Sequence, residues 1–496
     1  MSWLVLGLFV PAIASAAFVC WRQPFYVLYG LAIGLVLHNT VFMLLFAAGA
    51  RGWQLTFAQS WKEILVAVAL ASVYRDALRF RRLPFRPGPA DVAALLFALV
   101  VVLYALIPQH VLGGHAGAHA ELYGTRHFLI AVLAYLLGRG LAPGRAELRK
   151  LALVILSAAA VAAVAGLAEE YLVSVEHWRS LGAPRYFNQQ LEYPRTFGPG
   201  GLPENFVLNT SGGVYRRLVS FFLSPLGSAH LFVVALCLAA AGVLGVARRR
   251  LVAGAGALAF VGLLFSFTRS ALIALAGALV LLAAVERRVV AAGLGLVVLA
   301  ATVGFAALFP SIAPKTHFFK SDLAAQRALN AKAHHRSPGA NPLHSTVTFS
   351  ESSEGEHLSE LKSGARSLLD HPQGYGLGNS GSTARRFGVP PRAGESFYLE
   401  VGADTGIVGL ALWLAFSALV LHGLFIRVRG AAERFDRRLA AGLLAAAAAL
   451  SAIAVISDVW GSPWAAYLVW ALSGAALTLA PRHAEERELR TRLVTA

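Results

Sequence analysis

Charged residues are scarce in this chain: they make up 14% of its 496 residues, whereas hydrophobic residues make up 57%. A soluble domain cannot bury that much apolar surface, but a lipid bilayer can take it up as lipid-facing surface. The composition therefore excludes an ordinary soluble protein and predicts a polytopic membrane protein.

Cysteine is almost absent. The two cysteines, Cys20 and Cys237, both lie inside apolar runs, which argues against a disulfide framework. Positive charge is also missing before the first apolar run, and Arg22 follows that run. This charge order is not that of a secretory signal peptide, so we expect a retained segment with its N-terminus outside.

A basic stripe interleaved with aromatic residues is missing as well, although the net charge is +17. Nucleic-acid binding needs such a surface, so we expect no nucleic-acid partner. The arginines gather instead in short loops between apolar runs, which is the pattern of the positive-inside rule and of a protein in contact with membrane lipids.

About thirteen apolar segments have the length of a membrane span. Lys62 and Glu63 lie near the start of the third segment, which is either spanning or re-entrant. The predicted fold class is an all-α polytopic membrane protein with about 12–13 transmembrane helices and a large, partly helical outer loop. The segments are 3–20, 25–48, 60–77, 91–108, 126–143, 150–172, 227–247, 251–267, 270–286, 289–309, 399–425, 438–457 and 463–480.

The basic loops all fall on one side when the spans between them are counted, and this side is the predicted cytoplasmic side. They contain Arg79 to Arg86, Arg139 to Lys150, Arg248 to Arg250, Arg287 and Arg288, and Arg427 to Arg438. The intervals 109–125, 173–226 and 311–395 then lie outside. The chain divides into transmembrane helices with a smaller outer loop (1–310), a large outer loop (311–395), C-terminal transmembrane helices (396–480) and a cytoplasmic tail (481–496).

The large outer loop is expected to contain an amphipathic helix. A capping-box pattern occurs at 353–356, and Leu358, Leu361, Ala365 and Leu368 then recur at helical spacing before Pro372. We expect this helix to lie on the membrane domain like a lid. A loop of this size is typical of an enzyme that works at a membrane surface.

Arginines at the outer face are the main candidates for binding. Arg269 interrupts two apolar segments at an outer hairpin, where it either extends its charge to the interface or binds an anion through its planar guanidinium. Arg216 and Arg217 approach from the same side, as does Arg126 at the head of its segment. Several arginines at one outer surface would suit a lipid-linked diphosphate.

Glu395 stands where the large loop meets the membrane. It is either a general base or acceptor-orienting carboxylate, or a charge that complements a helix dipole. His371 is a base or an ordinary loop histidine, and Asp404 a buried hydrogen-bonding partner. Glu169 and Glu170 are expected to cap a helix or to pair with basic residues.

Four histidines, at positions 110, 115, 119 and 127, are close together in the sequence. Acidic or cysteine ligands do not accompany them at a recognisable spacing, so we expect no metal site. The glycines at 374, 376 and 378 lack the strand and helix of a dinucleotide site and predict a turn that lets backbone approach a ligand.

The order of several motifs resembles the O-antigen ligase and O-antigen polymerase superfamily of bacterial membrane glycosyltransferases. An arginine precedes Ser220-Phe221-Phe222, Ser-Phe-Thr-Arg-Ser-Ala follows at 266–271, and the large loop ends in His-Pro-x-Gly-x-Gly-x-Gly at 371–378. A Tyr-Leu-Glu re-entry at 398–400 completes the order, and the resemblance covers roughly 120–430.

The resemblance implies an undecaprenyl-diphosphate-linked glycan donor, a glycan or lipid-linked glycan acceptor, transfer on the periplasmic or extracellular face of the bacterial cytoplasmic membrane, and no metal or nucleotide cofactor. Arg217 and Arg269 match the family's diphosphate-binding arginines, and His371, Gly376 and Tyr398 belong to motifs expected to contact substrate. Ligases that act on lipopolysaccharide have a histidine where this chain has Glu395-Ser396. The resemblance therefore implies neither a histidine base nor a particular acceptor.

The mechanism expected is direct displacement at the anomeric carbon. Arg217 and Arg269 stabilise the leaving diphosphate, with Arg126 or Arg216 in support, and Glu395 orients or deprotonates the acceptor. The alternatives are a lipid-linked oligosaccharide flippase and a non-catalytic partner in envelope assembly. The large loop and the absence of an internal repeat argue against the flippase. Ligase and polymerase are not separated by these motifs.

Overall fold

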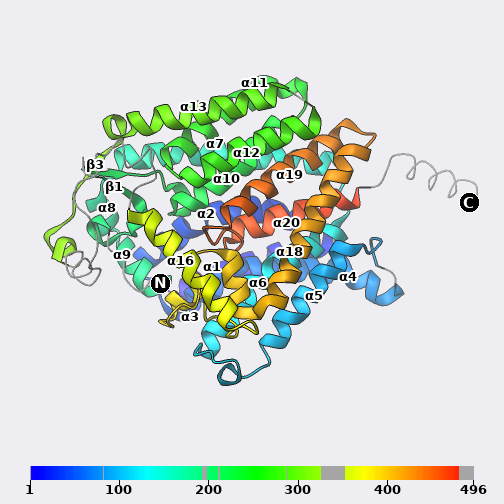
Figure 1. Cartoon of the computed structure of the whole chain (residues 1–496), viewed down its shortest axis with the longest axis horizontal. Helices are drawn as coiled ribbons and strands as arrows, with labels where there is room; N and C mark the ends of the chain where they lie inside the picture. The colour runs from blue at the N-terminus through cyan, green and yellow to red at the C-terminus, as the bar shows by residue number, and fades with distance from the viewer. Residues whose placement is uncertain are drawn as a thin grey trace, which may run out of the picture.

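The structure is a computed structural model, and it describes residues 2–81, 83–192, 198–210, 213–287, 289–324 and 352–479. Most of the described chain is helical, and the longer helices pack against one another in one body (Figure 1). The middle of the expected large loop and the C-terminal tail lie outside the described residues, as do the side chains of the capping-box pattern at 353–356.

Long helices coincide with every apolar segment predicted from the sequence. They are α1 (Ser2–Arg22), α2 (Tyr26–Ala47), α4 (Trp61–Phe80), α5 (Pro89–Tyr104), α6 (Ala118–Leu141), α7 (Arg145–Leu172), α10 (Pro225–Ala240), α11 (Arg249–Phe265), α12 (Arg269–Glu286), α13 (Val289–Ile312), α18 (Phe397–Gly430), α19 (Arg434–Ile453) and α20 (Pro463–Thr478).

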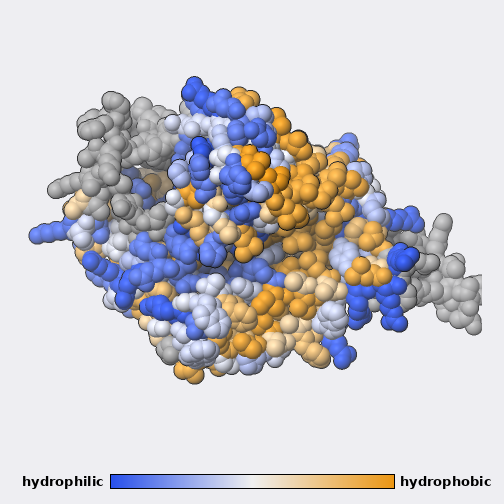
Figure 2. Space-filling model, turned by 90° about the horizontal axis from the view of Figure 1, so that it is seen from below, coloured by the Kyte–Doolittle hydropathy of each residue, from blue (hydrophilic) through white to orange (hydrophobic). Residues whose placement is uncertain are grey.

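Six of these helices, α1, α2, α7, α12, α13 and α18, are long and apolar enough to cross a membrane, and α5 and α10 are shorter apolar helices. Figure 2 shows a hydrophobic belt between a broad hydrophilic face and a narrower hydrophilic rim. Leu95, Leu99 and Leu103 of α5 are among the large apolar side chains exposed on the surface. The prediction of an all-α polytopic membrane protein is confirmed.

Shorter elements connect these helices. They are α3 (Gly52–Gln59), α8 (Val175–Ser180), α9 (Ala183–Arg185), α16 (Ser352–Asp370) and α17 (Gly381–Arg386), the π-helical turn η2 (Tyr186–Gln190), and the 3₁₀ turns η1 (Gln109–Val111), η3 (Pro199–Gly201), η4 (Glu204–Phe206), η5 (Ser220–Phe222) and η6 (Val246–Arg248). Helix α16 is the amphipathic helix expected in the large loop. It ends at Asp370, two residues before Pro372, and packs against α18.

A small antiparallel sheet was not predicted from the sequence. Strand β1 (Val207–Thr210) pairs with β2 (Gly213–Arg216), and β2 pairs with β3 (Lys315–Thr316). Strands of two to four residues are too short to show the alternation that identifies a strand. The sheet ties the segment before η5 to the end of α13, and so fixes the position of Arg216 and Arg217.

The most extensive helix–helix contact in the described part of the chain is between α6 and α20. A Cβ atom built on Gly138 would lie 1.9 Å from the carbonyl oxygen of Ala471, and one on Gly474 would lie 2.3 Å from that of Tyr135. Small residues allow two membrane helices to approach this closely. These glycines therefore determine how near α6 comes to α20.

Replacing Gly138 by alanine is expected to destabilise the protein by about 1–3 kcal/mol, because the added methyl group forces the two helices apart. The matched control is Gly277→Ala on α12, where a Cβ meets nothing within 4 Å. Alanine favours a helix over glycine there by up to about 1 kcal/mol, so this control should unfold no earlier than wild type. Thermal unfolding of the purified proteins in detergent measures both. Equal midpoints for the two variants would contradict the close contact.

Candidate functional site

Arg217 contacts the turn that leads into Arg269. The Arg217 guanidinium donates to the carbonyl oxygens of Ser266 (2.9 Å) and Phe267 (3.4 Å) and to Oγ1 of Thr268 (3.2 Å). Helix α12 begins at Arg269, the next residue. Phe267 has a φ of 47°, an uncommon conformation for a bulky residue, and its ring packs on Phe309. Arg217 therefore stabilises the turn that precedes Arg269 and the start of helix α12.

Arg216 and Arg126 have carboxylate partners within the protein. The Arg216 side chain is buried, and its guanidinium donates to Glu169 and to the carbonyl oxygen of Val173. This agrees with the paired role expected for Glu169. Arg126 binds Glu63 through Nε (2.7 Å) and Nη2 (2.6 Å). These ion pairs connect Arg216 to α7 and Arg126 to α4. They neutralise much of the positive charge of each arginine.

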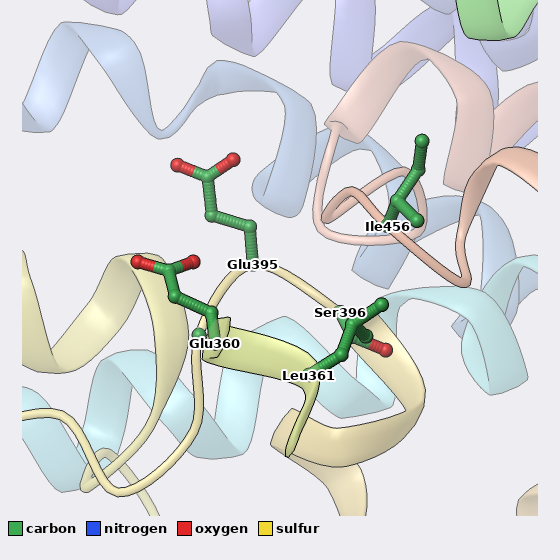
Figure 3. Close-up of a pocket in the computed structure, with 6 residues that line it drawn as sticks. Glu360, Leu361, Glu395, Ser396 and Ile456 are labelled. Carbon is green, nitrogen blue, oxygen red and sulfur yellow. The ribbon is translucent and has the colours of Figure 1, made fainter. Parts of the chain in front are cut away.

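Glu395 lines a small pocket, partly open to solvent, between α16 and the start of α18. Its Oε1 accepts from Nη1 of Arg385 (2.9 Å), while Nη2 of Arg385 donates to Oε1 of Glu360 (2.8 Å). Figure 3 shows the Glu360 and Glu395 carboxylates on the same side of the pocket, with Ser396 and Ile456 across it. One guanidinium thus holds two carboxylates at the pocket wall.

The histidine-proline-glycine motif forms a loop between α18 and the segment before α6. Nε2 of His371 lies 2.9 Å from the carbonyl oxygen of Leu112, and the His371 ring stacks on Tyr375 with a centroid distance of 4.2 Å. Gly376 has a φ of 92°, and a Cβ there would lie 2.7 Å from the Gln109 side chain. The turn expected from the glycines is present. In the described part of the chain it packs against the backbone of Leu112 and the side chain of Gln109.

Asn379 fastens this loop. Its Nδ2 donates to Oε1 of Gln109 (2.7 Å) and to the carbonyl oxygen of Gly376 (2.9 Å). Its Oδ1 accepts from the backbone N–H groups of His115 (2.8 Å) and Ala116 (3.1 Å). Asn379 is 1% exposed, so shortening its side chain would leave at least the buried Ala116 N–H and Gly376 carbonyl groups without this partner.

Asn379→Ala is expected to destabilise the loop by about 3 kcal/mol, because each buried polar group left without a partner costs about 1–3 kcal/mol. Proteolysis at 371–380 should become faster and the thermal midpoint should fall. Asn205→Ala, at an exposed position on the same protein, is the control and should leave both unchanged. If the two variants resist proteolysis equally, the loop is held by other contacts.

Asp404 and Tyr398 both make hydrogen bonds to backbone groups of neighbouring segments. Oδ2 of Asp404 accepts from the backbone N–H of Gly378 (2.7 Å), and α18 kinks two residues later at Gly406, where φ is 71°. This confirms the expectation that Asp404 is a buried hydrogen-bonding partner. The Tyr398 hydroxyl donates to the carbonyl oxygen of Ser451 (2.9 Å), which ties α18 to α19.

His127 lies apart from the other histidines of the sequence cluster and meets two carboxylates. Its Nε2 is 3.2 Å from Oδ1 of Asp458 and 3.7 Å from Oε2 of Glu400. Burial alone would raise the pKa of Asp458, but the neighbouring His127 and the hydrogen bonds from Ser382 and the Gly461 backbone lower it below its usual value. Sequence reasoning missed this cluster, although Glu400 stands in the Tyr-Leu-Glu motif.

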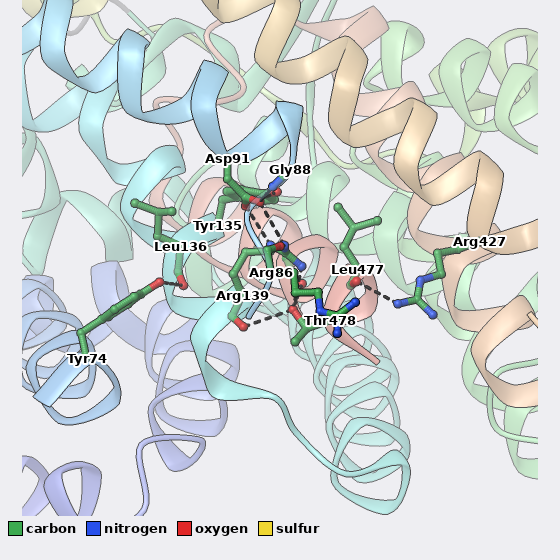
Figure 4. A network of polar contacts seen from close by, with 11 residues as sticks. Tyr74, Arg86, Gly88, Asp91, Tyr135, Leu136, Arg139, Arg427, Leu477 and Thr478 are labelled. Carbon is green, nitrogen blue, oxygen red and sulfur yellow. Dashed lines mark hydrogen bonds and ion pairs between the residues drawn. The ribbon is translucent and has the colours of Figure 1, made fainter. Parts of the chain in front are cut away.

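A second buried network lies near the other end of α6 (Figure 4). Arg139 donates from Nε to Oδ1 of Asp91 (2.8 Å), and the Tyr135 hydroxyl donates to the same oxygen (2.9 Å). Nη1 of Arg139 also donates to Oγ1 of Thr478 (3.0 Å), and Oδ2 of Asp91 accepts from the Gly88 backbone at the start of α5 (2.7 Å). This network joins α5, α6 and α20 and has a structural role.

Sequence reasoning also missed Arg385 and Glu360. Both are in the large loop, and a pair of arginines at 385 and 386 was the available signal. Arg386 donates to the Tyr123 hydroxyl (2.7 Å) and to Oε2 of Glu192 (3.2 Å). Arg385 and Arg386 therefore connect the C-terminal end of α17 to different parts of the protein.

A family model described as O-antigen ligase matches residues 254–414. The match includes Arg269, His371, Gly376, Glu395 and Tyr398, and it starts after Arg126, Arg216 and Arg217. A search of curated proteins finds no match. Residues 254–414 thus match the O-antigen ligase family, which supports the resemblance seen in the order of the sequence motifs, and the fold is that of an all-α polytopic membrane protein.

Proposed function

We propose that the protein is a membrane glycosyltransferase that transfers a glycan from an undecaprenyl-diphosphate carrier to a hydroxyl group of an acceptor glycan. The reaction takes place on the outer face of the bacterial cytoplasmic membrane, in the assembly of cell-surface polysaccharide. The observation that carries the proposal is the turn at 266–269. It lies inside the O-antigen ligase match and joins two arginines from distant parts of the sequence.

The donor diphosphate binds at this turn. The planar Arg269 guanidinium offers two parallel N–H donors to a phosphate, and a lysine at the same place would offer a point charge. Arg217 holds the turn through three hydrogen bonds to residues 266–268 and adds a second positive charge beside it. The apolar helices α12 and α13 next to the turn leave large side chains exposed to lipid, where the polyprenyl chain would lie.

The acceptor binds in the pocket at Glu395. The carboxylate is half-exposed, and Arg385 holds one of its oxygens, so the other oxygen is oriented toward an incoming group. Glu360 places a second carboxylate on the same side (Figure 3). Carboxylates accept hydrogen bonds from sugar hydroxyl groups, and a fixed carboxylate is pre-organised for that contact.

In the transfer step the acceptor hydroxyl oxygen forms a bond to the anomeric carbon, and the bond from that carbon to the diphosphate oxygen breaks. The hydroxyl proton passes to Glu395, and the electron pair of the broken bond leaves with the diphosphate. Arg269 and Arg217 stabilise the negative charge that develops there. Arg126 and Arg216 support the site indirectly, since each is paired with a carboxylate of the protein.

The test uses the full-length protein in detergent with a fluorescent glycan linked to undecaprenyl diphosphate. A longer lipid-linked glycan in this reaction indicates a polymerase, and transfer to an added acceptor lipid indicates a ligase. The same protein in vesicles tests the alternative flippase: movement of the unchanged donor between leaflets, without any new product, would overturn the proposal.

A further inference from the structure

Three side chains from distant parts of the sequence meet next to the Glu395 pocket. His127 comes from the third turn of α6, Glu400 from the first turn of α18, and Asp458 from the connection between α19 and α20. One ligand atom from each lies within 4.8 Å of the other two. This is the one such group of histidine, cysteine and carboxylate side chains in the part of the chain that the structure describes.

The buried Glu400 carboxylate is only partly satisfied by the described residues around it. Glu400 is 2% exposed, and its Oε1 has no hydrogen-bond partner among them. Asp404 lies one helical turn further along α18, also buried, and its Oδ1 has none either. A buried carboxylate oxygen without a partner is costly, because its desolvation is not offset by a hydrogen bond or an opposite charge.

The spacing of the three groups suits a divalent cation. With zinc–nitrogen and zinc–oxygen bonds of about 2.1 Å, two ligand atoms in a tetrahedral site lie about 3.4 Å apart. The distances from Nε2 of His127 to Oδ1 of Asp458 and to Oε2 of Glu400 are 3.2 and 3.7 Å. One imidazole with two carboxylates is a ligand set that zinc and similar divalent transition metals accept.

The surrounding backbone positions the ligands. A Cβ on Gly461 would lie 1.9 Å from Cε1 of His127, and one on Gly381 would lie 1.9 Å from Cδ of Glu400. The Ser382 hydroxyl donates to Oδ2 of Asp458 (2.9 Å), and the Gly461 backbone N–H donates to its Oδ1 (3.0 Å). Such outer contacts orient metal-binding side chains.

We propose that His127, Glu400 and Asp458 bind one divalent transition-metal ion of the zinc class. The ion fastens α6, the start of α18 and the α19–α20 connection to one another beside the pocket that Glu395, Ser396 and Ile456 line. The sequence alone predicts no metal site, because acidic or cysteine ligands do not accompany the four histidines at a recognisable spacing. The ion has a structural role and is independent of the transfer chemistry proposed above.

The experiment measures bound metal and stability. Full-length protein in detergent is treated with EDTA, incubated with zinc chloride and desalted, and its zinc content is determined by mass spectrometry. We expect one retained ion per chain and a thermal unfolding midpoint several degrees above that of the EDTA-treated protein. Glu400→Gln removes one ligand at nearly the same volume and should abolish both retention and the shift.

Glu360→Gln is the matched control. It makes the same chemical change in the neighbouring pocket, outside the three ligands, and should retain zinc as wild type does. Asp458→Asn serves as the second ligand variant if Glu400→Gln is not monodisperse by size exclusion. Wild-type protein that retains no zinc, or ligand variants that retain as much as wild type, would overturn the proposal.

Discussion

Glycan transfer by Arg269→Lys is expected to be about a hundredfold slower than by the wild-type protein. Lysine keeps the positive charge but cannot form two parallel hydrogen bonds to a phosphate. Losing one strong contact to the charge of the transition state costs about 3 kcal/mol, which corresponds to this rate. The effect should appear in the turnover rate at saturating lipid-linked donor, since the contact strengthens as the diphosphate leaves.

Arg287→Lys is the matched control for this variant. Arg287 is exposed and follows the other end of the same helix, α12, so the substitution makes the same chemical change outside the proposed site. It should transfer glycan at the wild-type rate. Equal amounts of each protein in the membrane must be verified by immunoblot. An arginine that only extends to the interface would tolerate lysine, so near-normal transfer by Arg269→Lys would remove Arg269 from the site.

The membrane helices could be predicted because their signal is local. Apolar runs of span length identified α1, α2 and α7 within a few residues, and the spacing of Leu361, Ala365 and Leu368 identified α16. Helix formation in a bilayer satisfies every backbone group within the segment itself, so distant residues are not needed to recognise it. The adjacent motifs also placed Arg269 at a turn between two helices.

The partners of the charged residues could not be predicted, because they depend on contacts between distant segments. Arg216 and Arg217 are neighbours in the sequence, yet Arg216 turns to Glu169 of α7 and Arg217 to the turn at 266–268. Arg216 is the last residue of β2 and Arg217 the first residue after it, and successive side chains of an extended segment point to opposite sides. His127 was grouped with nearby histidines, whereas its neighbours in space are carboxylates from α18 and the connection before α20.

Glu395→Gln is expected to reduce glycan transfer by two to four orders of magnitude, roughly the contribution of a positioned general base. Glutamine keeps the size of the side chain and can still accept a hydrogen bond from Arg385, but its amide cannot take the acceptor proton. The defect should lie in the turnover rate at saturating acceptor, and the affinity for the lipid-linked donor should stay unchanged because the donor binds at the turn before α12.

Glu360→Gln separates this role from a structural one. Both carboxylates accept from the same Arg385 guanidinium, with distances of 2.8 Å for Glu360 and 2.9 Å for Glu395, and both line the same pocket. If Glu395 served only to hold Arg385, the two substitutions would reduce transfer to a similar extent. A base at Glu395 instead predicts a far larger loss of turnover for Glu395→Gln, while Glu360→Gln mainly weakens acceptor binding. Transfer rates measured across acceptor concentrations for both variants, with equal thermal midpoints as the check on folding, decide between these roles.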